Sequence, residues 1–172
     1  EWLTTFLVEF AEQADFLVDY PYESGGNILI SQANALATAG TLMPEFKNAE
    51  KWMETGYQIL SEEVQNQIMS DGWHKEMSLH YHIGIVADFY EAMKLAEANQ
   101  LSSKLPSNFT EPLRKAAEVV MHFTYPNYFS KGSDNVVPMF NDSWSRTRNV
   151  LKNTNFKQYV EMFPDSEELK YM

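Results

Sequence analysis

Hydrophobic residues recur at three- and four-residue steps along most of the chain, which is the spacing of one face of an α-helix. An amphipathic helix is predicted over residues 2–19, with the apolar positions Trp2, Leu3, Phe6, Leu7, Phe10, Ala14, Phe16 and Leu17. The stretch "DYPYESGG" interrupts this pattern with one proline and two glycines. A second helix is predicted from about Asn27 to Thr41, and it carries small residues suited to close helix packing: Ala33, Ala35, Ala37, Ala39 and Gly40.

The same periodicity predicts further helices. One covers about residues 46–69, and its apolar stripe consists of Trp52, Met53, Tyr57, Leu60, Val64 and Ile68. The next covers about residues 78–99, with an inward face formed by Ile85, Phe89, Met93 and Leu95. A fifth helix is expected from Thr110 to about Tyr125, because Thr110 is a suitable cap and a proline follows in the first turn.

The remainder of the chain is predicted to be mostly loop. Residues 126–143 are rich in turn-forming residues, and short helical pieces are expected near 143–151 and 155–162. Asp165 or Ser166 is expected to cap a last helix that would be cut short at the end of the chain. We therefore expect the 172 residues to be a piece of a longer protein.

Long helical segments without a strand pattern predict an all-α fold of antiparallel helical hairpins. We expect residues 1–172 to form a single helical region, because this length fits one domain or part of a larger one. No run of 18 apolar residues occurs, so insertion into a membrane is not expected. The absence of cysteine excludes disulfides and thiolate zinc sites.

The net charge of −11 argues against a nucleic-acid partner. The charge is unevenly distributed, however. Residues 131–157 carry five basic against two acidic side chains, a net charge of +3, so the rest of the chain carries −14. Such a segment is either a local patch for an anionic ligand or a solvated helix face.

The stretch "SLHYHIG" places Tyr81 between His80 and His82. Two histidines at positions i and i+2 of a helix point about 200° apart, so they do not bind one metal ion together. We expect no metal site here. Two interpretations remain open for this stretch: a proton-transfer site, or an ordinary buried polar cluster at the start of a helix.

Four phrases occur together in a characteristic order: "GGNILISQANALATAGTLMPEFKNAEKW", "ILSEEVQNQIMSDGWHKEMSLHYHIG", "VPMFNDSW" and "MFPDSEELKYM". In this combination the chain resembles, over about residues 20–172, the N-terminal helical domain of the heparinase II/III group of polysaccharide lyases. The resemblance implies an incomplete (α/α) toroid followed by an antiparallel β domain, with the active site between them. This chain would hold roughly the later half of the toroid, and the β domain would be absent from it.

The resemblance also implies the chemistry, which is β-elimination on polysaccharides that contain uronic acid. A base removes the proton at C5, and the bond to the oxygen at C4 breaks. The match places the donor to the uronate carboxylate at Asn27 and a catalytic acid or base at Tyr81. Each has a structural alternative: Asn27 as a turn or N-cap residue, and Tyr81 as a packed tyrosine.

Ile28, rather than histidine, follows Asn27. This makes the chain more similar to the heparinase-III-like branch, in which the partner histidine comes from the β domain. The resemblance further implies an acidic polysaccharide substrate, heparin-like or heparan-sulfate-like or related, no cofactor in this chain, and a periplasmic or secreted location. Candidates for substrate binding are His82, Glu76, Asn141, Asp142, Trp144 and Arg146, although a surface or core role is an alternative for each.

Two other functions remain open at this point. Helical toroids also occur in glycoside hydrolases, which need two carboxyl groups, and the candidates here are Asp71, Glu76, Asp88 and Asp142. A helical scaffold that binds a partner protein is the second alternative, but the chain shows no convincing repeat of fixed period. The sequence indicates neither the particular polysaccharide nor the oligomeric state.

Overall fold

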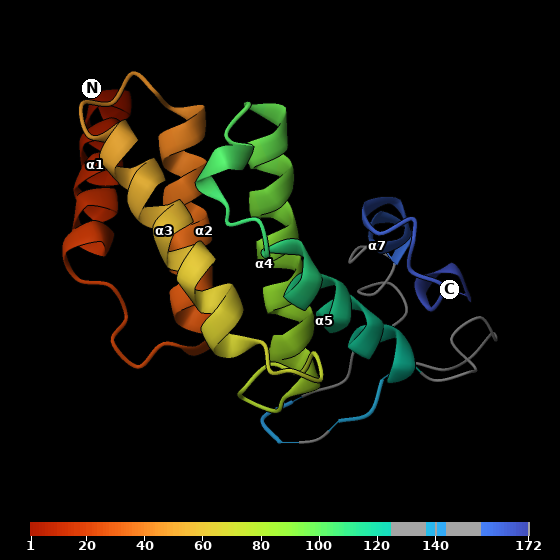
Figure 1. Ribbon diagram of the computed structural model, residues 1–172. Helices are drawn as coiled ribbons and strands as arrows, with labels where there is room; N and C mark the ends of the chain where they lie inside the picture. The colour runs from red at the N-terminus through yellow and green to blue at the C-terminus, as the bar shows by residue number, and fades with distance from the viewer. Residues whose placement is uncertain (125–136, 140, 144–155, 172) are drawn as a thin grey trace. The chain divides into compact units, whose positions relative to one another are not determined.

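The structure, a computed structural model, describes residues 1–124, 137–139, 141–143 and 156–171. Within these ranges the regular elements are helices and one isolated antiparallel bridge between Ile68 and His74, which confirms the all-α prediction. The helices are α1 (Trp2–Asp19), α2 (Gly26–Leu42), α3 (Ala49–Gln67), α4 (Leu79–Ala98), α5 (Thr110–His122) and α7 (Phe156–Met162), with short 3-10 helices η1 (Ser102–Lys104) and η3 (Leu169–Tyr171) (Figure 1). None of the described helices is long and apolar enough to cross a membrane.

The chain groups into two compact units. The first unit contains Glu1–Glu63 and Asp88–Ser107, and the second contains Val64–Ala87 and Asn108–Met172. Helices α3 and α4 are continuous, and each contributes residues to both units. Each unit has its own hydrophobic cluster, described separately below.

The core of the first unit is built around Trp52 of α3, which is 1% exposed. Its ring packs against Phe10 of α1 and Phe46, with centroid distances of 6.2 and 5.3 Å. The indole N–H donates a hydrogen bond of 2.6 Å to Asp15 Oδ1, so the polar end of the buried ring has a partner. Asn48 Nδ2 donates to both oxygens of the same carboxylate, at 3.0 Å each. This network fixes α1 against the start of α3.

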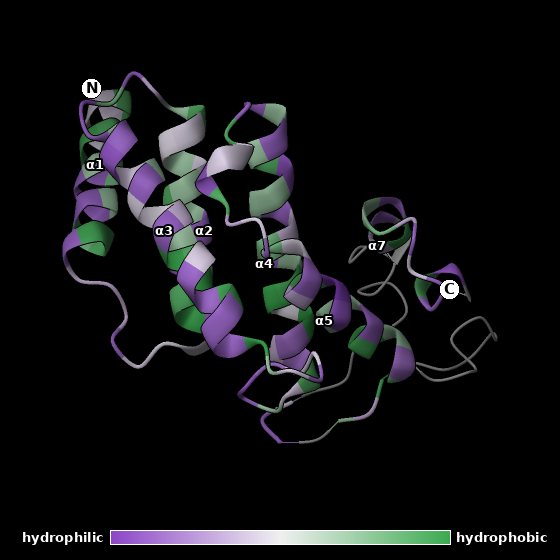
Figure 2. Ribbon diagram, viewed as in Figure 1, coloured by the Kyte–Doolittle hydropathy of each residue, from purple (hydrophilic) through white to green (hydrophobic). Residues whose placement is uncertain are grey.

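Helices α1, α2 and α3 run in alternating directions in the first unit, and each carries hydrophobic and hydrophilic sides (Figures 1 and 2). The predicted close packing of small residues is confirmed between α2 and α3. A Cβ atom added at Gly40 would lie 2.3 Å from the carbonyl oxygen of Ala49, and one added at Gly56 would lie 2.4 Å from the backbone nitrogen of Ala37. Both glycines are therefore required by the contact between the two backbones.

The single apolar stripe predicted for α1 is wrong for five of its members. The exposed fractions are 78% for Trp2, 51% for Leu3, 54% for Phe6, 36% for Leu7 and 59% for Phe16. The face that α1 buries is instead centred on Ala14. Phe16 lies two residues beyond Ala14, a rotation of about 200°, and so projects from the opposite side of the helix.

The second unit has a core at the start of α4. Leu79 and Ile83 of α4 pack with Val120 of α5 and with Val137, and all four are at most 1% exposed. The ring of Trp73 packs against this cluster and meets Phe123 at a centroid distance of 4.8 Å. The first turns of α4 are thus anchored on α5.

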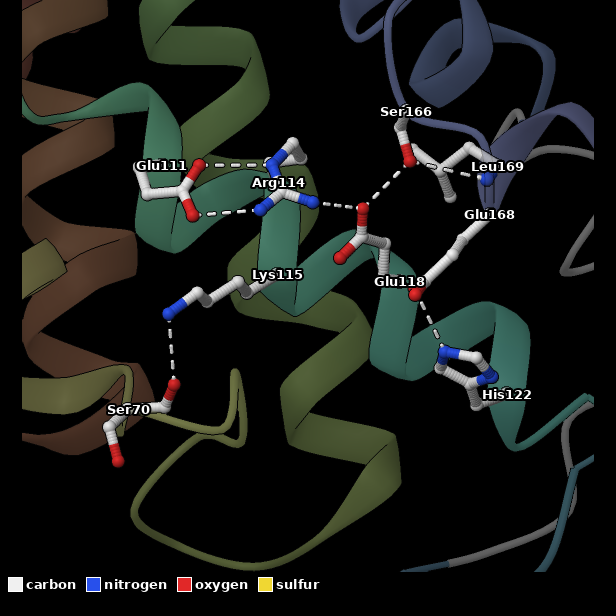
Figure 3. Close-up of polar contacts among 9 residues, drawn as sticks. All are labelled: Ser70, Glu111, Arg114, Lys115, Glu118, His122, Ser166, Glu168 and Leu169. Atoms are coloured by element: carbon white, nitrogen blue, oxygen red, sulfur yellow. Dashed lines mark hydrogen bonds and ion pairs between the residues drawn. The ribbon is translucent and has the colours of Figure 1, made fainter.

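A polar network joins α5 to the C-terminal segment of the same unit (Figure 3). Ser166 Oγ donates to Glu118 Oε1 at 2.7 Å, and the Leu169 N–H donates to Ser166 Oγ at 3.3 Å. Glu118 is also paired with Arg114, whose guanidinium makes two further hydrogen bonds to Glu111. The glutamate therefore links the helix to the segment that ends in η3.

Two predictions about helix ends have different outcomes. Thr110 is the first residue of α5 rather than its cap, because Phe109 occupies the N-cap position and makes no side-chain cap. Ser166 does precede a short helix, and its hydroxyl accepts from an N–H at the start of η3, as predicted for one of the two candidates. The helical piece predicted near 143–151 lies almost wholly outside the described residues.

Candidate functional site

Tyr81 lies in the first turn of α4, where Ser78 fixes the start of the helix. The Tyr81 N–H points at Ser78 Oγ over 3.5 Å, and the His82 N–H donates to the Ser78 carbonyl oxygen at 2.9 Å. A serine that accepts from an N–H three residues later is a typical N-cap. Ser78 is 1% exposed, so the backbone that carries Tyr81 is anchored in the interior.

The phenol of Tyr81 is paired with a carboxylate. Its hydroxyl donates a hydrogen bond of 2.7 Å to Asp142 Oδ2. This hydrogen bond raises the pKa of the Tyr81 phenol, with further contributions from burial and from the negative charges of Asp142 and Glu76. The His80 ring packs on the tyrosine at a centroid distance of 5.5 Å in an edge-on arrangement. Tyr81 therefore presents a protonated hydroxyl in the first turn of α4.

The loop that carries Asp142 is tied to the residues just before α4. Ser78 Oγ donates to the Asp142 carbonyl oxygen at 2.7 Å, and Asn141 Nδ2 donates to the Met77 carbonyl oxygen at 2.5 Å. Met77 and Asn141 have positive φ angles of 56° and 54°, which side chains other than glycine adopt infrequently. The hydrogen bonds thus hold an unusual backbone that brings Asp142 to Tyr81.

His82, a candidate for substrate binding, lies in the interior of the second unit. Its side chain is buried, and both ring nitrogens have protein partners. The His74 N–H donates to His82 Nδ1 at 3.1 Å, so the ring proton is on Nε2 and is donated to the Ala116 carbonyl oxygen at 2.8 Å. Burial lowers the pKa of His82 to about 4. The structure places this histidine as a neutral support beneath the first turn of α4.

His74 extends this support into α3. It is 0% exposed, and its Nε2 lies 2.8 Å from Oε1 of the buried Gln67. Burial is the main reason that the pKa of His74 is lowered to about 4, with a smaller contribution from Lys75. Sequence patterns did not identify His74, Gln67 or Ser78 as supports. The serine at the helix start was a usable signal, whereas the other two become neighbours only in the fold.

No group of three or more histidine, cysteine, aspartate or glutamate side chains suited to a metal ion occurs in the part of the chain that the structure describes. His80 is half-buried beside Tyr81, while His82 points into the interior. The two histidines thus lie in different environments.

Asn27 belongs to the first unit and is the second residue of α2. Gly25 and Gly26 precede it with φ angles of 67° and 74°, a left-handed backbone that glycine adopts without strain. Gly25 occupies the N-cap position, so the alternative that Asn27 itself caps the helix is wrong. Asn27 is half-buried in the first turn.

A polar face continues along α2 from Asn27, because Ser31 and Asn34 follow at helical spacing. Ser31 Oγ donates to Asp88 Oδ2 at 2.6 Å, and Asn34 Nδ2 lies 3.4 Å from Asp88 Oδ1. Burial raises the pKa of Asp88, while these two hydrogen bonds oppose the shift. Asp88 therefore connects α4 to the helix that carries Asn27.

The other candidate residues have varied positions. Glu76 is half-buried and adds negative charge near Tyr81. Asp71, one of the carboxylates considered for a hydrolase, accepts a hydrogen bond of 3.1 Å from the Trp73 N–H and so stabilises a turn. Trp144 and Arg146 lie outside the described residues.

Together these features define an all-α protein that presents a tyrosine–carboxylate pair at the first turn of a helix. The pattern of the family described as "Heparinase II/III N-terminus" matches residues 1–171. The chain belongs to this family, as the resemblance predicted.

The chain is similar along its whole length to proteins named heparin-sulfate lyase. It is 97% identical over 172 residues to the one from Bacteroides thetaiotaomicron, a match that covers 100% of this chain and 24% of the relative. The one from Pedobacter heparinus is 28% identical over 170 residues, covering 99% of this chain and 24% of the relative. The chain thus spans about a quarter of the length of these relatives.

Solved structures agree with this relationship. A crystal structure of heparinase III matches with a TM-score of 0.94 and 97% identity, over 99% of this chain and 26% of that chain. The heparan sulfate lyase HepC from Pedobacter heparinus matches with a TM-score of 0.70 and 29% identity, over 98% of this chain and 25% of that chain. The helical fold described above is therefore shared with these proteins.

Proposed function

We propose that this chain is the part of a polysaccharide lyase that supplies Tyr81 and Asn27 to the cleavage of heparan-sulfate-like chains by β-elimination. The proposal is carried by one observation: Tyr81, at the position that the family resemblance assigns to proton transfer, is partly exposed, and its hydroxyl is hydrogen-bonded to a carboxylate. The names of the relatives support the class of substrate.

The reaction has three requirements, and the chain's residues suit two of them. A base takes the C5 proton, the electron pair of that bond forms the C4–C5 double bond, and the C4–O bond breaks toward the leaving oxygen. The leaving oxygen needs a proton, for which the Tyr81 phenol is the donor. The uronate carboxyl group gains charge as the C5 proton leaves, and the neutral amide of Asn27 is able to bind it without titrating.

We propose that the third requirement, the partner histidine, is met by a segment beyond these 172 residues. The buried position of His82 supports this, because both of its ring nitrogens are already hydrogen-bonded to the backbone. An (α/α) toroid completed by further helices, a following β domain and a periplasmic or secreted location remain part of the same proposal.

The test uses a full-length lyase in which this sequence replaces the matching segment of the Bacteroides thetaiotaomicron relative. Products of elimination contain a conjugated C4–C5 double bond and absorb in the near ultraviolet, whereas hydrolysis gives saturated products. We expect absorbing products from heparan sulfate. Tyr81→Phe is expected to lower kcat by about 10²–10⁴-fold, and Asn27→Ala by about 10²–10³-fold.

Tyr90→Phe is the matched control, because Tyr90 lies on the same helix and is not among the residues of the site. It should retain activity. Circular dichroism establishes that each variant is folded. Wild-type rates in folded Tyr81→Phe, or saturated products from the unmodified protein, would contradict the proposed function.

A further inference from the structure

Asp142 was expected to bind substrate, but its contacts in the structure are directed at Tyr81 and at the residues before α4. Its side chain accepts from the Tyr81 hydroxyl at 2.7 Å, and its carbonyl oxygen accepts from Ser78 at 2.7 Å. The side chain of Asn141, the residue before Asp142, donates a hydrogen bond to the Met77 carbonyl oxygen. The carboxylate is thus held against the tyrosine by hydrogen bonds from Asn141 and Asp142 to the two residues before α4.

The direction of the hydrogen bond determines which atom carries the proton. An ionised carboxylate only accepts, so the hydrogen between the two oxygens belongs to the phenol. Ionisation of Tyr81 would place two negative charges 2.7 Å apart, which disfavours the phenolate. The titratable groups recorded around this hydroxyl in the described residues are Asp142 on the loop, Glu76 before the helix and His80 on α4.

We infer that Asp142 is a positioning residue that keeps the Tyr81 phenol protonated and oriented for the proton-donor role proposed above. The inference rests on the proposed function and adds a residue that acts on the tyrosine, not on the substrate. The raised pKa of the phenol agrees with the geometry.

The proton balance of the step follows from this assignment. Another group removes the C5 proton, and the electrons of that C–H bond form the double bond as the C4–O bond breaks. The Tyr81 O–H bond then gives its proton to the leaving oxygen, and the resulting phenolate recovers a proton from solvent. Asp142 neither gives nor takes a proton in this step. It turns the phenol toward the loop until the glycosidic oxygen replaces the carboxylate as acceptor.

The test compares Asp142→Asn with the unmodified chimeric lyase over a pH series from neutral to strongly alkaline. Asparagine keeps the size of the side chain and removes its charge. We expect the alkaline limb of the kcat profile to move to lower pH, because the phenol loses its proton more readily, while KM changes less than twofold. Asp142→Glu restores a carboxylate and should return the limb toward its original position.

Asp71→Asn is the matched control. Asp71 is an aspartate of the same unit, and its side chain accepts a hydrogen bond from the Trp73 N–H. It should leave the profile unchanged. A rise in kcat at neutral pH in Asp142→Asn would show that the phenolate is the active form, which overturns the inference. A raised KM with an unshifted kcat profile would show that Asp142 binds the substrate. This result would also overturn the inference.

A second readout separates this inference from the proposed function. Titration of tyrosinate absorbance, taken as the difference between each protein and its Tyr81→Phe variant, reports the ionisation of Tyr81 without substrate. Asp142→Asn should move this ionisation to lower pH even if no unsaturated product is ever formed. An unmoved titration contradicts the role of Asp142, whatever the activity.

Discussion

The backbone N–H of His74 donates a hydrogen bond of 3.1 Å to Nδ1 of His82, and this fixes His82 as a neutral ring with its proton on Nε2. Protonation of Nδ1 would place a hydrogen against an N–H donor inside the core. Both histidines have a pKa lowered to about 4 by burial. The support beneath Tyr81 is therefore built from two histidines that must stay uncharged.

Stability is predicted to fall in acid for this reason. In the unfolded chain these histidines bind protons below about pH 6.5, whereas in the folded protein they do so only near pH 4. The stabilisation is complete above the unfolded pKa and is lost as the pH falls toward the folded value. Each histidine contributes a slope of about 1.4 kcal/mol per pH unit within that window. Urea denaturation at a series of pH values measures the slope.

Two variants make this prediction specific. His82→Leu should be less stable at neutral pH, because it leaves the His74 N–H and the Ala116 carbonyl oxygen without their partner, but its pH slope should be roughly halved. His122→Ala removes an exposed histidine that pairs with Glu168, and the slope contributed by His74 and His82 should remain. An unchanged slope in His82→Leu would exclude the buried ring as the source.

The contact between α2 and α3 predicts that Gly56→Ala destabilises the first unit. The new Cβ would lie 2.4 Å from the Ala37 nitrogen and 2.6 Å from the Ala33 carbonyl oxygen, which are backbone atoms that yield only if the helices separate. Overpacking of this kind costs about 1–3 kcal/mol, and it should exceed the gain in helix propensity of about 1 kcal/mol. Thermal unfolding followed by circular dichroism measures the difference, and a raised Tm would contradict the close approach.

The helices could be predicted from the sequence because the spacing of hydrophobic residues within each helix depends only on neighbouring positions. Trp52, Tyr57, Leu60 and Val64 were predicted as the stripe of α3, and all four are buried. Periodicity is less informative where apolar residues occur all round a helix, and so Phe16 of α1 was wrongly assigned to the buried face.

The candidate site was predictable only in part. Spacing alone showed that His80 and His82 diverge, but it did not show which of them faces the core. That depends on Ala116 and His74, which become neighbours only when the chain folds. The contact between Tyr81 and Asp142 likewise closes a separation of 61 positions. Local sequence patterns do not predict a contact between residues so far apart, although Tyr81 and Asp142 were each candidate site residues.

Gly84 lies three residues after Tyr81 on α4, and an added Cβ there meets no described atom within 4 Å. A glycine inside a helix costs about 1 kcal/mol relative to alanine, so Gly84→Ala should raise the free energy of unfolding by up to about that amount. This is the opposite sign to Gly56→Ala, although the two substitutions are chemically identical. Chemical denaturation of both variants tests the pair.

Activity gives Gly84 a second test. Residues three apart share a helix face, so open space at Gly84 adjoins the Tyr81 side chain. If a sugar ring occupies this space, Gly84→Leu in the chimeric lyase should raise KM at least several-fold while the protein stays as stable as Gly84→Ala. An unchanged KM in a folded Gly84→Leu variant would show that the space is not used by the substrate.

Ser166→Ala is predicted to loosen the C-terminal segment of the second unit. The substitution removes the donor to Glu118 Oε1 and the acceptor for the Leu169 N–H, and both Ser166 and Glu118 are at least nine-tenths buried. Loss of a buried hydrogen bond to a charged group costs about 1.5–3 kcal/mol.

Glu167→Ala is the neighbouring control, because its pair with Lys170 is exposed and should contribute less than about 1 kcal/mol. Hydrogen exchange should show faster exchange of the Leu169 amide in Ser166→Ala, with α5 amides such as Val120 still protected. Equal exchange at Leu169 in both variants would contradict the view that Glu118 and Ser166 hold this segment on α5.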